Sequence, residues 1–268
     1  MGAPLVLVKL GGSLITDKGR PGIARRATIR RLAREIAALP RSNGAPRVVL
    51  GHGSGSFGHV AAAEGGLGSR TGRPARALGI AHTQHRAAEL HAIVIEALDA
   101  AGARPFSLAP SSFMTCSKGR VAKVFGDPLF HALTAGLVPV VYGDVVLDRE
   151  RGAVVVSTEE VFVALAREAA RRGVPVARAV WLGETDGVFE AGGDTVGRLT
   201  AAGALRRSLR VSGAAGVDVT GGMALRLRST AALARRSVPS FILDGRRPGS
   251  LAAAVAGRMN GGTRVLAR

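Results

Sequence analysis

Runs of apolar and β-branched residues alternate along the chain with longer stretches of helical period. The apolar runs predict strands at residues 5–10, 47–50, 138–142, 154–156, 178–182, 240–243 and 263–266. The helical stretches predict helices at residues 25–38, 76–100, 128–135, 159–172, 201–209, 223–235 and 250–256. Such alternation is typical of βα units, in which helices cover both faces of a mostly parallel sheet. We therefore expect an α/β fold.

Glycine-rich segments follow the ends of several predicted strands. They are GGS (11–13), GHGSGSFGHV (51–60), GD (143–144) and GETDG (183–187). Open parallel sheets bind ligands beyond the carboxyl ends of their strands, and glycine lets a ligand approach the backbone closely. Several such turns on one edge predict a long, phosphate-rich site rather than a small apolar pocket. Segments 61–75 and 190–200 are glycine-rich and polar, so we expect surface loops there.

Two common nucleotide motifs do not account for these turns. The P-loop pattern GxxxxGK[ST] is absent. Gly53, Gly55 and Gly58 form a G-x-G-x-x-G pattern after a strand, as in dinucleotide-binding proteins. The acidic residue expected about twenty positions later is missing, because that region is basic (70–76). A dehydrogenase is therefore not favoured.

Composition sets outer bounds on the class of protein. The 268 residues are 47% hydrophobic, enough for a sizeable core. No apolar stretch reaches the roughly 18 residues of a membrane span, and the N-terminus does not read as a signal peptide. The single cysteine, Cys116, excludes an internal disulfide framework. We expect a cytoplasmic protein with no membrane segment.

The charge is the most unusual bulk property. A formal net charge of +18 raises the possibility of nucleic-acid binding. However, only four of the 37 basic residues are lysine, and the arginines are scattered along a chain rich in alanine and glycine. This pattern is typical of a GC-rich coding sequence, and one Tyr and one Trp give little surface for base stacking. We expect no specific nucleic-acid partner, and where arginine is the default cation a retained lysine is informative.

Six segments, in order, resemble the amino-acid kinase superfamily and within it the isopentenyl phosphate kinases. They are KLGGSLITDK (9–18), HGSGSFGH (52–59), APSSF (109–113), LVPVVYGDVVLD (137–148), TDGV (185–188) and DVTGGM (218–223). The resemblance implies a three-layer αβα sandwich and transfer of the γ-phosphoryl group of ATP, with Mg²⁺, to isopentenyl phosphate. It implies one domain over residues 1–268, with an acceptor-binding lobe at about 1–150 and an ATP-binding lobe at about 151–268. Members are usually homodimers.

The resemblance also implies roles on the acceptor side. His59 would donate a hydrogen bond to the acceptor phosphate, whose oxygen is already anionic and needs no strong base. The acceptor would also contact Gly53, Ser54, Gly55, Gly58, Gly143 and Asp144. Backbone N–H groups in such a turn can hold phosphate oxygens. Asp144 can equally cap a turn, and His52, nearer the strand end, can equally be structural.

On the ATP side, the resemblance assigns the transferring phosphoryl group to Lys9 and the phosphates to Lys18 and Arg226. Lys9, Lys18 and Arg226 join His59 as the candidate catalytic residues. The remaining candidate ATP-binding residues are Gly11, Gly12, Ser13, Asp186, Thr220, Gly221 and Gly222. Lys9 and Lys18 can also be read as solvated charges, and Asp186 as an ordinary turn residue. We expect no metal-ligating side chain.

Three positions depart from the family pattern. Ser54 stands where the family commonly has glycine, and whether its added Cβ is tolerated depends on the φ angle of this residue. Arg226 replaces a lysine, which keeps the charge but not the point-charge geometry. Glu159 replaces an aspartate that is thought to orient the lysines, so Glu159 and Arg226 can be a paired compensation.

The identity of the acceptor's organic tail is left open by the sequence. Candidate lining residues are Leu67, Leu78, Ile80, Ile93, Val94, His82, His85 and His91. The aliphatic residues favour an isoprenoid tail, although several can be core positions. The histidines leave room for a polar acceptor, as in a kinase of a small phosphonate or phosphate. A basic nucleic-acid-binding protein on a degenerate kinase fold is the alternative from another class.

The compositional origin of the charge can be tested by DNA binding. We expect weak binding of duplex DNA, without sequence preference, that is lost near physiological salt because only counterion release drives it. Fluorescence anisotropy over a salt series measures this. Nanomolar binding that persists at about 0.2 M salt would instead support the nucleic-acid alternative.

Overall fold

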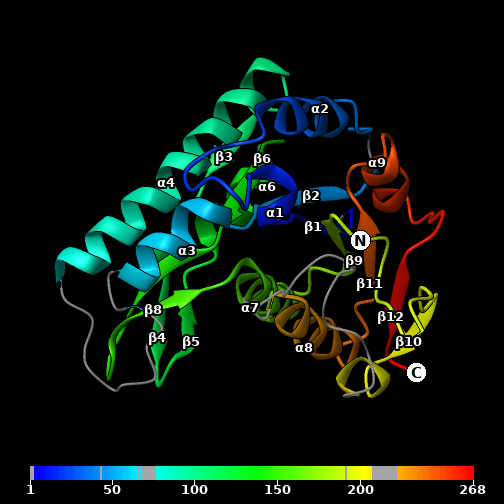
Figure 1. Cartoon of the computed structure of the whole chain (residues 1–268). Coiled ribbons are helices and arrows are strands. Elements are labelled where there is room, and N and C mark those ends of the chain that lie inside the picture. Colours follow the sequence, from blue (N-terminus) through cyan, green and yellow to red (C-terminus); the bar gives the residue numbers. More distant parts are fainter. Residues whose placement is uncertain (1–2, 43, 65–66, 68–76, 191, 207–221) are drawn as a thin grey trace.

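The computed structural model describes residues 3–42, 44–64, 67, 77–190, 192–206 and 222–268 (Figure 1). Its main sheet has eight strands in the order β10-β12-β11-β9-β1-β2-β6-β3. They are β1 (Leu5–Leu10), β2 (Arg47–His52), β3 (Pro105–Ser107), β6 (Val138–Tyr142), β9 (Val176–Gly183), β10 (Arg198–Thr200), β11 (Ser240–Asp244) and β12 (Thr263–Leu266). All neighbours pair in parallel except β11 with β12. The expected α/β sandwich is confirmed.

Helices cover both faces of this sheet (Figure 1). One layer contains α1 (Gly12–Ile15), α2 (Arg26–Ala37), α3 (Gly55–Glu64), α4 (Ala77–Ala100) and α9 (Ser250–Val255). The other contains α6 (Asp127–Thr134), α7 (Thr158–Arg171), the 3₁₀ turn η1 (Gly203–Leu205) and α8 (Gly222–Ala234). No helix in the described ranges is long and apolar enough to cross a membrane.

The alternating side chains of β1 supply both cores. Leu5 and Leu7 pack into the core under α6, α7 and α8, whereas Val6, Val8 and Leu10 pack under α2, α4 and α9. Successive side chains of a strand point to opposite faces, so a strand buried on both sides is apolar throughout. Lys9 is the exception, and by the same alternation it points toward α7 and α8.

A second sheet extends from the main one where β6 ends. It has four strands in the order β5-β4-β7-β8, namely β4 (Met114–Ser117), β5 (Arg120–Val124), β7 (Asp144–Asp148) and β8 (Gly152–Val156), and α5 (Pro110–Phe113) precedes it. The buried carboxylate of Asp148 accepts the N–H groups of Gly119, Glu150 and Arg151, which ties its two hairpin turns together. The chain turns from the main sheet into this one at Gly143.

Several expected elements need correction. The stretch 51–60 is not an extended loop, because β2 runs to His52 and α3 begins at Gly55. Residues 61–64 continue α3, and Arg198–Thr200 forms β10 within the expected loop 190–200. The helix expected at 201–209 is the short η1 in its described part, residues 201–206. The expected loop residues 65–66, 68–75 and 191 lie outside the described residues.

Candidate functional site

The carboxyl ends of the central strands meet at one edge of the main sheet. In the sheet register Leu10 lies beside His52 and Leu182, and His52 lies beside Tyr142. The glycine-rich turns that follow β1, β2, β6 and β9 therefore lie next to one another. This is the edge where a ligand site is expected in a parallel sheet.

The turns after β1 and β2 touch through their backbones. A Cβ added to Gly12 would lie 2.8 Å from the Cα and N atoms of Gly55, and one added to Gly53 would lie 2.9 Å from the Gly12 nitrogen. Thr16, which is fully buried, links the turns: its hydroxyl donates to the Gly12 carbonyl (2.7 Å) and accepts the Ser56 N–H (3.1 Å). Glycine is therefore required at these positions because a side chain would clash with the facing turn, and not only because the backbone needs flexibility.

This contact leaves backbone donors without partners. In the described part of the chain, the N–H groups of Gly12, Ser13, Ser54 and Gly55 make no hydrogen bond within the protein. The N–H groups of Gly11 and Gly53 are instead held by the carbonyls of strand-end residues. Unpaired N–H groups clustered in adjacent turns form a concavity suited to anions. The donors available here match phosphate oxygens in chemistry.

Lys9 and Glu159 form a buried ion pair next to these turns. The exposed fractions of the two residues are 6% and 4%. Arg226, on α8, lies close enough to act on both charges, and its Nη1 would lie 3.1 Å from a Cβ at Gly183. Glu159 therefore forms an ion pair with Lys9 and interacts electrostatically with Arg226. The ion pair joins β1 to α7.

The pKa values of this cluster shift for opposing reasons. Burial lowers the pKa of Lys9, as does the Arg226 charge, against the effect of Glu159. Burial alone would raise the pKa of Glu159, but Lys9 and Arg226 outweigh it and hold that pKa below its ordinary value. Glu159 is therefore ionised at neutral pH. With two cations and one carboxylate, the cluster has spare positive charge for an anionic ligand.

Ser54 fits because of a glycine one turn along α3. It has a negative φ, whereas Gly55 has φ +50°, so the departure from glycine falls where a side chain is allowed. A Cβ on Gly58 would lie only 2.5 Å from the Cβ and Oγ of Ser54. The space that Gly58 leaves is thus occupied by the Ser54 side chain.

Asp144 has a structural role in this geometry. It is buried, and its carboxylate accepts the N–H groups of Ser111 (3.0 Å) and Val145 (2.8 Å). Burial raises its pKa against these hydrogen bonds. The carboxylate fastens α5 to the start of β7 beside Gly143, which favours the turn-capping interpretation.

The other predicted site residues differ in their exposure, and two of them lie outside the described part of the chain. Asp186 is half-buried and pairs with Arg247 (2.9 Å), Lys18 is exposed, and Gly222 begins α8. His59 belongs to α3, while Thr220 and Gly221 lie outside the described residues.

Few of the candidate tail-lining residues come together. Leu67 and Ile80 pack with Val145, Ala153 and Ala62 in a small apolar cluster between α3, α4 and the second sheet. Leu78 is exposed, and Ile93 and Val94 belong to the core against α2. His82 and His85 are exposed, whereas His91 is buried beside His52.

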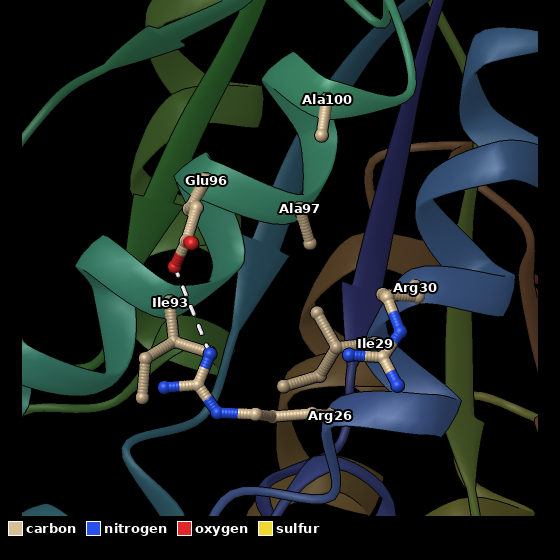
Figure 2. Close-up of a pocket in the computed structure, with 7 residues that line it drawn as sticks. All are labelled: Arg26, Ile29, Arg30, Ile93, Glu96, Ala97 and Ala100. Atoms are coloured by element: carbon tan, nitrogen blue, oxygen red, sulfur yellow. Dashed lines mark ion pairs between the residues drawn. The ribbon is translucent and has the colours of Figure 1, made fainter.

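A pocket of about 110 Å³ lies elsewhere, between α2 and α4 (Figure 2). Arg26 and Glu96 face each other across it with 3.7 Å between Nη1 and Oε2, both side chains being more than half exposed. Ile93, a candidate tail-lining residue, is among the residues that line it, but none of the residues predicted to contact the phosphates is. It therefore has no part in the site at the strand ends.

Sequence reasoning missed the residues that hold the turns in place. Thr16 and Thr158 are such residues, and nothing in their local sequence marks them, while His91 was named only as a possible lining residue of the acceptor's tail. Thr158 donates its hydroxyl to the His52 carbonyl (2.6 Å), and the Gly143 N–H donates to the same oxygen (3.1 Å). Only the three-dimensional arrangement brings Thr158 and His91 to His52 and places Thr16 between the two turns.

Comparisons with known proteins agree with this fold. The sequence model of the amino acid kinase family matches residues 4–244, and the chain belongs to that family. The isopentenyl phosphate kinase of Methanothermobacter thermautotrophicus is 33% identical, covering 97% of this chain and 98% of its own. That of Haloferax volcanii is also 33% identical, with 96% and 97% covered.

Solved structures show the same architecture. An X-ray structure of isopentenyl phosphate kinase is 28% identical and superposes with a TM-score of 0.79 over 97% of this chain and 99% of that one. N-acetylglutamate synthase from Neisseria gonorrhoeae, 20% identical, has a TM-score of 0.72 over 99% of this chain and 60% of its own, which shows the fold alone. The chain is thus a kinase of the amino acid kinase family.

The coupling between Glu159 and Arg226 can be measured by a double-mutant cycle. Arg226→Lys and Glu159→Asp should each lower kcat/KM, measured separately for ATP and for the acceptor. The first substitution moves the positive charge of residue 226, and the second withdraws the carboxylate from Lys9. If the pair compensates, the double variant recovers more than additivity allows, with an interaction energy of about 0.5–3 kcal/mol. Arg228→Lys, exposed on the same helix, is the control. Strict additivity would show that the two positions are independent.

Proposed function

We propose that this kinase transfers the γ-phosphoryl group of ATP to isopentenyl phosphate, giving isopentenyl diphosphate and ADP. An oxygen of the acceptor phosphate forms the new bond to the γ-phosphorus, and the bond from that phosphorus to the β,γ-bridging oxygen breaks. The observation that carries the proposal is the contact between two turns with unpaired N–H groups, beside Lys9 and Arg226. Relatives of that name are 33% identical over nearly the whole chain.

The main obstacle to this reaction is charge repulsion between two phosphate groups. The acceptor oxygen is already anionic, so the transfer depends on positioning and charge stabilisation. In our proposal the turn after β1 and the Lys9 and Arg226 side chains bind the phosphates of ATP. The turn after β2 and His59 bind the acceptor phosphate. Backbone contact between the turns then keeps the two phosphates at a fixed separation.

The remaining ATP contacts follow from the same proposal. Asp186 and the segment that ends in Gly222 lie in the proposed nucleotide-binding lobe, at about residues 151–268. Lys18 joins the nucleotide side from the proposed acceptor-binding lobe, at about residues 1–150. The described residues contain no cluster of three or more His, Cys, Asp or Glu side chains for a metal. We therefore propose Mg²⁺ as the ion that arrives with ATP, held mainly by its phosphates. We also propose a homodimer, as the resemblance implies.

The apolar cluster around Leu67 supports an aliphatic tail on the acceptor. It lies beside α3, the helix that contains His59, and its neighbours Val145 and Ala153 come from the second sheet. The three histidines that would favour a polar acceptor do not join it, because His82 and His85 are exposed and His91 is buried against His52. The preference is therefore for an isoprenoid over a small polar phosphate or phosphonate.

An acceptor panel tests the proposed substrate. ADP release would be followed with isopentenyl phosphate, glycerol 3-phosphate and a small phosphonate. We expect kcat/KM for isopentenyl phosphate to exceed the others at least about tenfold, because each buried CH₂ group contributes about 0.8 kcal/mol. A higher value for the phosphonate would favour the related kinase, and no turnover with any acceptor would contradict the proposed reaction.

The role of His59 can be tested separately. His59→Ala should fold normally and lose at least about tenfold in kcat/KM for the acceptor, because a charge-assisted donor in a dry site contributes a few kcal/mol. The KM for ATP should change little. His131→Ala, at an exposed position of α6, is the control. Wild-type kinetics in His59→Ala would remove His59 from the site.

A further inference from the structure

Two buried histidines lie directly beneath the turn after β2. His52, the last residue of β2, is fully buried, and His91 of α4 is 6% exposed. His52 Nε2 lies 3.0 Å from His91 Nδ1, and His91 Nε2 lies 2.8 Å from the Ser107 hydroxyl oxygen. At the other end, His52 Nδ1 lies 3.2 Å from the carbonyl oxygen of Gly53. The reaction proposed above makes no use of either ring.

The positions of the protons follow from the partners. A carbonyl oxygen only accepts, so His52 Nδ1 must bear a proton and donate to Gly53. In a neutral ring His52 Nε2 then accepts, so His91 Nδ1 must donate to it. His91 Nε2 in turn accepts from the Ser107 hydroxyl. Every ring nitrogen is paired, and the three hydrogen bonds run in one direction toward the Gly53 carbonyl.

The surroundings keep both rings neutral. Burial lowers the pKa of His52 to about 4, and burial together with His52 lowers the pKa of His91 to about 3. Tyr142 packs against both rings, with its ring centroid 4.3 Å from that of His91 and 5.6 Å from that of His52. The proton arrangement therefore does not change at neutral pH.

The Gly53 carbonyl determines the direction of the next N–H group. The described chain contains no cis peptide, and in a trans peptide the C=O and the following N–H point in opposite directions. Holding the carbonyl against His52 therefore directs the Ser54 N–H away from the histidines. The Ser54 nitrogen lies 3.8 Å from where a Cβ on Gly143 would be, and the Thr158 nitrogen lies 3.7 Å from that point. The space that the Gly143 side chain would occupy thus borders this donor.

We propose that His52 and His91 are positioning residues, which orient the Gly53–Ser54 peptide so that the Ser54 N–H binds the acceptor phosphate. The inference rests on the proposed function for the identity of that phosphate. His52 also holds the site through its backbone, since its carbonyl accepts from Gly143 and Thr158. His91 touches no predicted substrate group and acts only through His52.

Kinetics of His91 variants distinguish positioning from simple packing. His91→Leu should raise KM for isopentenyl phosphate about tenfold and leave KM for ATP unchanged, because the hydrogen bonds end at the acceptor turn. His91→Asn should recover most of the loss, since its amide N–H can donate to His52 in place of Nδ1. Val94→Ala, buried one turn along α4, is a control for lost packing. Unchanged acceptor KM in folded His91→Leu would overturn the proposal.

Nuclear magnetic resonance gives a readout that needs neither activity nor a stable His91→Leu variant. In the ¹⁵N-histidine-labelled wild type, both rings should show the Nδ1–H tautomer, and a Nε2–H tautomer on either ring would overturn the proposal. If isopentenyl phosphate proves not to be a substrate, the proposed function fails by itself. Inorganic phosphate is then the probe: it should shift the Ser54 amide signal in the wild type, bind about tenfold more weakly to His91→Leu, and bind His91→Asn nearly as tightly as the wild type. Equal phosphate affinity in wild type and folded His91→Leu would contradict positioning.

Discussion

The backbone contact between the turns after β1 and β2 is the constraint on which the site depends. Gly12 packs against Gly53 and Gly55 at distances that leave no room for a Cβ, and Thr16 fastens the two segments. The contact requires β1 and β2 to be adjacent, parallel and in register at their carboxyl ends, as Leu10 beside His52 shows. A one-residue shift between the strands would separate the turns and reverse which side chains enter each core.

Strand alternation then divides the supporting interactions between the two helical layers. On β1 the side chain of Lys9 follows Leu5 and Leu7 toward α7 and meets Glu159. On β2 the side chain of His52 follows Leu50 toward α4 and meets His91. Each turn is therefore supported by one polar pair from its own strand, on opposite sides of the sheet. Charge gathers on the α7 and α8 side, while neutral hydrogen bonds lie on the α4 side.

Local patterns predicted the parts of this arrangement that are set locally. The apolar runs predicted β1, β6 and β12 with their observed bounds. For β1 and β6 this is because strands buried on both faces need a continuous apolar sequence. The helix α3 was missed because Gly55, Ser56 and Gly58 are poor helix formers whose helix is stabilised by contact with the β1 turn. In the second sheet β4 and β5 were missed because they are short and contain polar or charged residues at several positions. The pairing that joins the two hairpins of this sheet, Cys116 with Asp148, connects segments far apart in the sequence.

Lys9 shows that local geometry can override the compositional preference for arginine. In a chain whose cations are almost all arginine, this site is 6% exposed, lies in a central strand and must reach Glu159 without displacing the adjacent turns. An ammonium group places a compact charge there, whereas a planar guanidinium needs more volume and several fixed donors. Arg226 approaches from α8, where a half-buried position accommodates the larger group. Arginine is thus used at the half-buried edge of the charge cluster, whereas the buried centre of the cluster keeps a lysine.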